Sequence, residues 1–124
     1  MSSPMNGRRV LIVDDADDIR TLLRTFLVAK DFTVVEARDG GEAITVLRTS
    51  TPSAMVLDLQ MPVVSGEEVI DMMLRGDAPI VPTVVLSGFP RRFAGLPDWL
   101  PCVRKGEDFV EIDSSVIDPP GVID

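Results

Sequence analysis

The stretch at residues 10–15, Val-Leu-Ile-Val-Asp-Asp, places four aliphatic residues directly before two carboxylates. An unbroken apolar run of this length is typical of a strand that is buried on both faces, as in a parallel sheet. Downstream, apolar residues recur at helical spacing, and Asp17 and Asp18 lie in the first turn, where the helix dipole favours negative charge. The residues of this apolar stripe are Ile19, Leu22, Leu23, Phe26 and Leu27. A buried strand followed by an amphipathic helix predicts a βα unit.

Further apolar runs predict four more strands, and helical spacing between them predicts more helices. The strands are expected at 32–35, 54–57, 83–86 and 102–104. The expected apolar faces are Ala43, Ile44 and Leu47 for the helix after Gly40-Gly41, and Val69, Ile70, Met73 and Leu74 for the helix after the loop 60–66. Alternating strands and helices indicate right-handed crossovers and a parallel sheet. We therefore predict an α/β fold with a five-stranded parallel sheet in the order 2-1-3-4-5 and helices on both faces.

The last third of the chain departs from this pattern. Three prolines within residues 89–101 leave room only for a short helix, so the fourth helix is predicted to be short or missing. A weak helix is expected after the fifth strand. Residues 1–118 are expected to form one domain, and residues 119–124, which begin with two prolines, are expected to be a tail or the start of a linker.

Composition limits the classes of partner and the compartment. The net charge of −8 argues against direct binding to nucleic acid or to an anionic membrane, because both rest on Lys and Arg. A single cysteine, Cys102, excludes an internal disulfide and fits a reducing compartment. No apolar run approaches the length of about 18 residues that a membrane helix needs. We therefore predict a cytoplasmic protein with neither a nucleic-acid nor a membrane partner.

Polar side chains follow four of the predicted strands. Asp14 and Asp15 come after the first, Asp58 after the third, Ser87 after the fourth and Lys105 after the fifth. The carboxyl ends of parallel strands meet at one edge of the sheet, so topology would gather these residues around one crevice. Three carboxylates sharing a crevice repel one another unless a cation intervenes, and hard oxygen ligands suit Mg²⁺.

The same set of residues suits phosphoryl transfer. An aspartate can act as a nucleophile and form an aspartyl-phosphate, while Mg²⁺, a lysine and a hydroxyl neutralise the developing charge. Each residue also has a plainer interpretation on its own. Asp14-Asp15 could cap a helix, Asp58 could be a turn residue, Ser87 a loop hydroxyl and Lys105 a solvated cation. All of them at successive strand ends favour the common site.

Four segments resemble the receiver-domain motifs of two-component response regulators. They are Val13-Asp14-Asp15, Leu57-Asp58-Leu59-Gln60-Met61-Pro62 with Gly66 after it, Leu86-Ser87-Gly88 and Val103-Arg104-Lys105. The resemblance extends over roughly residues 8–117. It implies a flavodoxin-like fold and a signalling domain that accepts a phosphoryl group on an aspartate.

The resemblance also implies a role for each acidic residue. Asp58 corresponds to the phosphoacceptor. Asp15 and Asp58 would ligate Mg²⁺ directly, Asp14 would do so through water, and Gln60 through its backbone carbonyl. Gln60 also stands two residues after the acceptor, at a position that influences the lifetime of the aspartyl-phosphate in this family.

The remaining implied roles concern the phosphoryl group and its source. Lys105 would pair with the phosphoryl oxygens, and Ser87 matches the hydroxyl that turns toward them. Since the chain has no histidine, a phosphohistidine donor must lie on another molecule. The resemblance implies that the donor is a sensor histidine kinase, a histidine phosphotransfer protein or a small molecule. We expect a signalling phosphoacceptor with a possible downstream protein partner, rather than an enzyme that turns over.

Three departures from the family pattern affect the expected output. Gly106 replaces the usual proline after Lys105, Cys102 stands where a switch aromatic is usual, and the interval between Ser87 and Lys105 is short. The chemical site is thus retained, whereas the signal is expected to leave by a rearranged surface at 89–100. The alternative is that this segment is a passive proline-rich loop.

Two other functions remain open at this point. A phosphohydrolase with an aspartyl nucleophile commonly needs a second aspartate two residues later, where Gln60 stands here. A docking module that does not depend on phosphorylation would tolerate Asp58→Asn without loss of signalling. Val63-Val64, in the loop after the acceptor, could contact a kinase or pack within the loop.

Overall fold

The computed structural model describes residues 8–61, 63–87 and 102–104. Strands and helices alternate through this part of the chain, as the sequence predicts. The elements are β1 (Arg9–Val13), α1 (Asp17–Val28), β2 (Thr33–Ala37), α2 (Gly40–Ser50), β3 (Ala54–Asp58), α3 (Gly66–Leu74), β4 (Thr83–Ser87) and β5 (Cys102–Arg104). The predicted fourth helix, the predicted last helix and the tail at 119–124 lie outside the described residues.

The strands form one parallel sheet in which β1 is an inner strand, between β2 and β3. Val10 lies beside Val34 of β2 on one side and beside Ala54 of β3 on the other. β4 continues the sheet from β3, so the predicted order 2-1-3-4 of the first four strands is confirmed. The three residues of β5 pair with β4, also in parallel.

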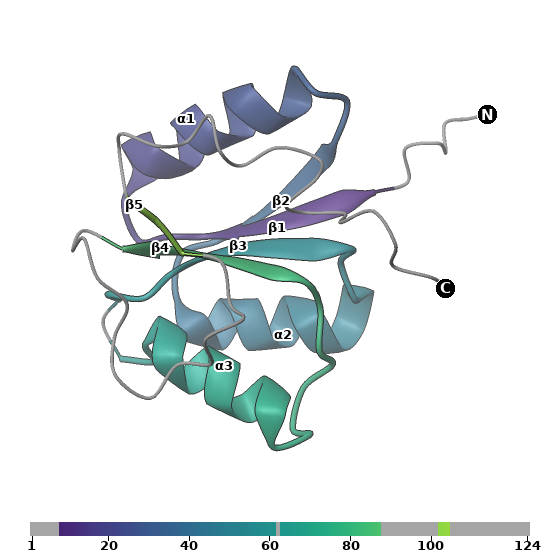
Figure 1. Ribbon diagram of the computed structural model, residues 1–124, viewed down its shortest axis with the longest axis vertical. Coiled ribbons are helices and arrows are strands. Elements are labelled where there is room, and N and C mark those ends of the chain that lie inside the picture. Colours follow the sequence, from purple (N-terminus) through teal and green to yellow (C-terminus); the bar gives the residue numbers. More distant parts are fainter. Residues whose placement is uncertain (1–7, 62, 88–101, 105–124) are drawn as a thin grey trace.

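Helices cover both faces of the sheet, with α1 on one face and α2 and α3 on the other (Figure 1). Alternate residues of β1 therefore enter two separate cores. Leu11 and Val13 belong to the core beneath α2 and α3, whereas Val10 and Ile12 belong to the core beneath α1. Because side chains alternate across a strand, two cores require an unbroken apolar run, which is the pattern at residues 10–13.

The predicted apolar stripe of α1 is wrong in part. Leu23 and Leu27 are buried, but Leu22 is 50% exposed, and Arg20 is buried instead. Leu74, predicted on the buried face of α3, is likewise half exposed. The sheet contacts a narrower face of each helix than the apolar residues alone indicate. Periodicity gives the direction of a helix face but not the width of the surface that covers it.

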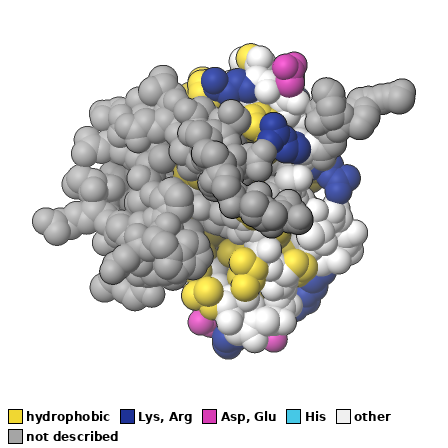
Figure 2. All heavy atoms as spheres, turned by 45° about the vertical axis from the view of Figure 1, so that its right-hand side comes forward, with side chains coloured by type: hydrophobic (Ala, Val, Ile, Leu, Met, Phe, Trp, Pro, Cys, Tyr) yellow, Lys and Arg dark blue, Asp and Glu magenta, His cyan; other side chains and the backbone are white. Residues whose placement is uncertain are grey.

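The surface of the described residues mixes apolar and charged groups. Figure 2 shows one face, on which hydrophobic side chains gather in the lower middle and basic side chains lie mainly toward the top and the edges. No helix in the described ranges has both the length and the apolar character that crossing a bilayer requires.

Candidate functional site

An acidic cluster lies where β1 and β3 end. Asp14 and Asp15 follow β1, Asp58 ends β3, and these two strands are neighbours in the sheet. One carboxylate oxygen from each of the three residues lies within 4.8 Å of the others. Asp14 and Asp58 are fully buried, whereas Asp15 is exposed. The structure therefore brings together three of the predicted site residues, at the edge of the sheet where topology placed them.

Main-chain hydrogen bonds orient the two buried carboxylates. The backbone N–H of Ala16 donates to Oδ1 of Asp14 at 2.9 Å, and that of Gln60 donates to Oδ1 of Asp58 at 3.1 Å. Both are bonds to an N–H two residues ahead, in which the aspartate closes the turn that follows its own strand. The carboxylates are thus held in place by local turns, before any ligand is considered.

The donor set of this cluster fits a hard divalent cation. Three carboxylates at this separation repel one another, and a cation between them removes the repulsion. Mg²⁺ prefers carboxylate and carbonyl oxygens and keeps several waters, for which the exposed side of Asp15 leaves access. Asp14, Asp15 and Asp58 are therefore the described residues that fit a metal ion. Gln60 contributes an N–H to Asp58, and the predicted role of its carbonyl stays a prediction.

Gly66 packs directly on the end of β3. A Cβ built at Gly66 would lie 2.3 Å from the carbonyl oxygen of Asp58 and 2.7 Å from Cα of Leu59. Both contacts are to backbone, which cannot swing aside like a side chain. A capping box formed by Ser65 and Glu68 starts α3 at the same place. The beginning of α3 therefore fixes the loop that follows Asp58.

The two valines of this loop have different environments. Val64 packs against the core beneath α2 and α3, and its side chain fills the space in which a Cβ of Gly40 would lie. Val63 is 94% exposed and has a positive φ of 67°. A β-branched residue in this left-handed conformation is strained. Loop packing thus describes Val64 but not Val63, and contact with a kinase stays a prediction for both.

The strain at Val63 leads to a stability prediction. Val63→Asn is expected to raise the free energy of unfolding by about 0.5–1 kcal/mol, because asparagine tolerates positive φ and the valine side chain has almost no packing to lose. Urea denaturation measures the change. The same substitution at Val28, which is also exposed but ends a helix, should bring no gain. A lower stability for Val63→Asn would contradict the assignment of strain.

Arg20 is a site-adjacent residue that the sequence reasoning missed. Its side chain comes from α1, is 10% exposed, and donates from Nη1 to the backbone carbonyl of Asp14 at 2.7 Å. Nε donates to Glu36 of β2 at 3.0 Å, and Nη2 donates to Asp17. The available signal was a cation on the face of α1 that also carries Leu23 and Leu27.

Glu36 also binds Arg24, whose Nε donates to it at 2.8 Å. Burial by itself would raise the pKa of Glu36, but the hydrogen bonds from Arg24 and Arg20 outweigh it and lower that pKa below its usual 4.5. Glu36 therefore remains charged and balances the two guanidinium groups. Arg20, Arg24 and Glu36 together join α1 to β2, beside the turn that carries Asp14.

Of the two other predicted site residues, Ser87 is described only in its backbone and Lys105 is not described. Ser87 ends β4, one position beyond Leu86, which pairs with Asp58. The backbone of Ser87 thus reaches the same edge of the sheet as the acidic cluster. Lys105 lies outside the described residues, directly after Arg104, whose partner in β4 is Ser87. The predicted roles of both residues remain predictions.

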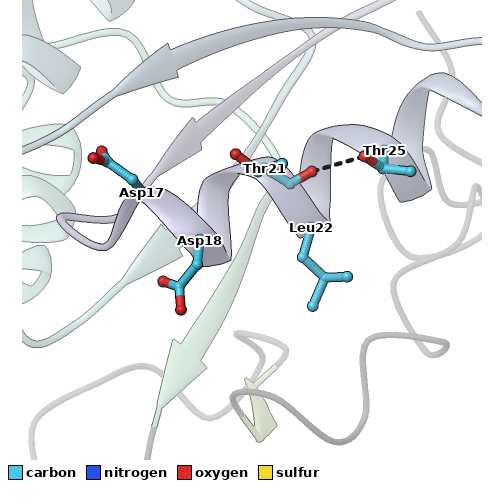
Figure 3. Close-up of a pocket in the computed structure, with 5 residues that line it drawn as sticks. All are labelled: Asp17, Asp18, Thr21, Leu22 and Thr25. Carbon is cyan, nitrogen blue, oxygen red and sulfur yellow. Dashed lines mark hydrogen bonds between the residues drawn. The ribbon is translucent and has the colours of Figure 1, made fainter.

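A hollow of about 610 Å³ lies beside α1. The described residues that line it all come from this one helix, as Figure 3 shows, and the hydroxyl of Thr25 donates to the carbonyl of Thr21 within the helix. The half-exposed Leu22 is its large apolar side chain. The described lining includes none of Asp14, Asp15 and Asp58, so within the described residues the hollow is distinct from the acidic cluster.

Comparison with known proteins gives the family. The profile of the family described as "Response regulator receiver domain" matches residues 10–94. The chain is 38% identical over 100 residues to the response regulator MprA of Mycobacterium tuberculosis, covering 75% of this chain and 43% of that protein. It is 34% identical over 93 residues to the probable transcriptional regulator ycf27 of Porphyridium aerugineum, covering 74% and 39%. The chain thus spans about two fifths of the length of these curated relatives.

Solved structures with the same fold are similar to this chain at modest sequence identity. The response regulator TrrA from Thermotoga maritima, in complex with Mg²⁺-BeF, has a TM-score of 0.76 at 28% identity, covering 88% of this chain and 96% of that one. TrrA in complex with the histidine kinase ThkA has a TM-score of 0.73 at 27% identity, covering 88% and 95%. Since the family profile also matches more than half of the sequence, the chain belongs to the response regulator receiver domain family.

Proposed function

We propose that this chain accepts a phosphoryl group on Asp58, with the assistance of Mg²⁺, and thereby switches a protein-interaction surface within a two-component or phosphorelay system. The observation that carries the proposal is the convergence of Asp14, Asp15 and Asp58, with one oxygen of each within 4.8 Å of the others. The likeness to TrrA, whose structure contains Mg²⁺-BeF, supports it.

The proposed step is an attack by a carboxylate oxygen of Asp58 on the phosphorus of the donor. A bond forms from that oxygen to phosphorus, the bond from phosphorus to the donor nitrogen or oxygen breaks, and the leaving group keeps the electron pair. A leaving imidazole nitrogen takes a proton from solvent, whereas a leaving carboxylate remains an anion. The hydrogen bond from Gln60 N–H fixes the plane of the Asp58 carboxylate before the attack. The chain then carries the phosphoryl group as a signal, and turnover of a substrate is not part of the proposal.

Asp15 and Asp58 would hold Mg²⁺ directly, Asp14 through water, and Gln60 through its carbonyl. The bound ion supplies positive charge that lowers the repulsion between the carboxylates and the incoming phosphoryl oxygens. Ser87 and Lys105 complete the proposal as the hydroxyl and the ammonium that meet those oxygens. We include β5 as the fifth strand of the sheet, since its pairing with β4 would deliver Lys105 to the same edge.

The proposed donor is a phosphohistidine on a sensor histidine kinase or on a histidine phosphotransfer protein. The complex of TrrA with the histidine kinase ThkA supports a kinase partner. A cytoplasmic location belongs to the same proposal, in keeping with the single cysteine. The downstream partner is proposed to be a protein, because the net charge of −8 disfavours direct contact with nucleic acid.

Beryllofluoride, which mimics a phosphoryl group on an aspartate, tests this function directly. The wild-type chain is expected to bind beryllofluoride when Mg²⁺ is present and to lose it when Mg²⁺ is chelated, because the acidic cluster repels the anion without a cation. Fluorine NMR reports the bound species. Absence of a bound signal at saturating Mg²⁺ would overturn the proposal in favour of a docking module that does not depend on phosphorylation.

A further inference from the structure

The turn that carries Asp14 and Asp15 begins where pairing with β2 ends. The N–H of Asp14 donates to the carbonyl of Ala37 at 3.2 Å, next to the last pair of the β1–β2 ladder, Val13 with Ala37. The carbonyl of Asp14 instead accepts from Nη1 of Arg20 at 2.7 Å. Where the β1–β2 ladder stops, the backbone carbonyl of Asp14 therefore accepts its hydrogen bond from a side chain of α1.

From this geometry we propose that Arg20 is a positioning residue for the metal site, acting through the main chain of Asp14. The inference rests on the proposed function to the extent that Asp14 and Asp15 serve as metal ligands. The contact that carries this role is the hydrogen bond from Arg20 to the carbonyl of Asp14. The ion pairs of Arg20 are with Asp17 and Glu36, which do not belong to the acidic cluster. Its part is to hold the turn in which those ligands lie.

The guanidinium is suited to this task because each of its three nitrogens has its own partner. Nη1 binds the carbonyl of Asp14, Nε binds Glu36 of β2, and Nη2 binds Asp17 at the start of α1. One planar group therefore connects the turn to the strand before it in the sheet and to the helix after it. Lysine has a single nitrogen and cannot reproduce this planar fork.

The charge of Arg20 does not explain its position, because a cation near a metal site opposes the binding of another cation. Its charge is balanced by Glu36, which also binds Arg24, and by Asp17. Loss of Arg20 would leave these carboxylates with less positive charge around them. By electrostatics alone, removal of the guanidinium should strengthen the binding of Mg²⁺.

A positioning role predicts the opposite change, weaker Mg²⁺ binding. Without the hydrogen bond from Arg20, the turn would hold Asp14 and Asp15 less firmly in the geometry that the ion needs. Replacing a group that orients metal ligands typically weakens metal binding by about 10–100-fold. We expect Arg20→Met to weaken Mg²⁺ binding by about tenfold, at the low end of that range, because Ala16 N–H still orients the Asp14 carboxylate. A role confined to packing α1 on β2 would leave the affinity of the folded protein unchanged or higher.

The experiment is a calorimetric titration of the full chain with Mg²⁺ alone, under conditions in which circular dichroism shows each variant to be folded. The matched control is Arg24→Met, which also removes one positive charge, together with two hydrogen bonds to Glu36. Arg24 binds the same carboxylate as Arg20, whereas the hydrogen bond to the carbonyl of Asp14 comes from Arg20. Arg24→Met is expected to change the affinity by less than about twofold, because it is an exposed charge. Tenfold weaker binding for Arg20→Met alone supports the positioning role.

A second variant keeps the test decisive if Arg20→Met does not fold. Arg20→Lys keeps the charge and removes the fork, so it is expected to bind Mg²⁺ more weakly than wild type. Unchanged or tighter binding by the folded Arg20 variants would overturn the inference while leaving the metal site intact. If the wild-type chain itself bound no Mg²⁺, the proposed function and this inference would both fail.

Discussion

Replacing Asp58 by asparagine is expected to abolish phosphoryl transfer to this chain. The amide has no negative charge to attack phosphorus, and it is a weaker ligand for Mg²⁺. Its oxygen can still accept the hydrogen bond from Gln60 N–H, so the turn should persist. Intact-mass spectrometry after incubation with acetyl phosphate and Mg²⁺ measures the effect, as the gain of one phosphoryl group by wild type and none by the variant.

Stability separates this loss of chemistry from a loss of fold. Asp58→Asn removes one of three mutually repelling carboxylates, so without metal the variant should be at least as stable as wild type. Asp71→Asn is the matched control, because it makes the same chemical change on the exposed side of α3 and should leave phosphorylation intact. If Asp58→Asn were phosphorylated to the same extent as wild type, another residue would have to be the acceptor.

Gly66→Ala is expected to have the largest effect on stability among single changes near the site. The new Cβ would lie 2.3 Å from the carbonyl oxygen of Asp58, so the start of α3 or the end of β3 must move. Overpacking of this kind costs about 1–3 kcal/mol, and a contact with rigid backbone belongs at the upper end. Urea denaturation should show the loss, and phosphorylation should slow because Asp58 shifts with its backbone.

The chain offers a control with the identical substitution. Gly41 lies in the first turn of α2, where, among the described residues, a Cβ would meet Oδ1 of Asp39 alone, at 3.3 Å. Gly41→Ala is therefore expected to be neutral or to stabilise the protein, by up to about 1 kcal/mol, through helix propensity. Equal stability of the two alanine variants would show that β3 and α3 can move apart at little energetic cost, which would contradict the prediction.

The sheet was predictable because burial on both faces leaves a plain signature in sequence. Residues 10–13 and 54–57 are unbroken apolar runs, and their structure has alternate side chains entering two cores. The acidic cluster followed from the same reasoning. Once β1 and β3 are neighbours, parallel topology brings Asp14, Asp15 and Asp58 together without any knowledge of side-chain contacts.

What could not be predicted depends on partners that are distant in sequence. The burial of Arg20 requires two partners: Glu36, sixteen positions away, and the backbone carbonyl of Asp14 directly after β1. Neither is visible in a helical periodicity that treats arginine as a surface residue. The exposure of Leu22 has the same origin, because the width of the covered face is set by the sheet and not by α1.

The contact between Arg20 and Asp14 is made to a peptide carbonyl, a group that every residue type possesses. The turn is therefore held through the main chain from position 20, while the carboxylate that we propose as a metal ligand is supplied at position 14. The side chain at position 14 also accepts the N–H of Ala16, so only a residue that keeps this acceptor leaves the turn intact. A designer could use asparagine at position 14 to retune ion selectivity and still inherit the original loop architecture.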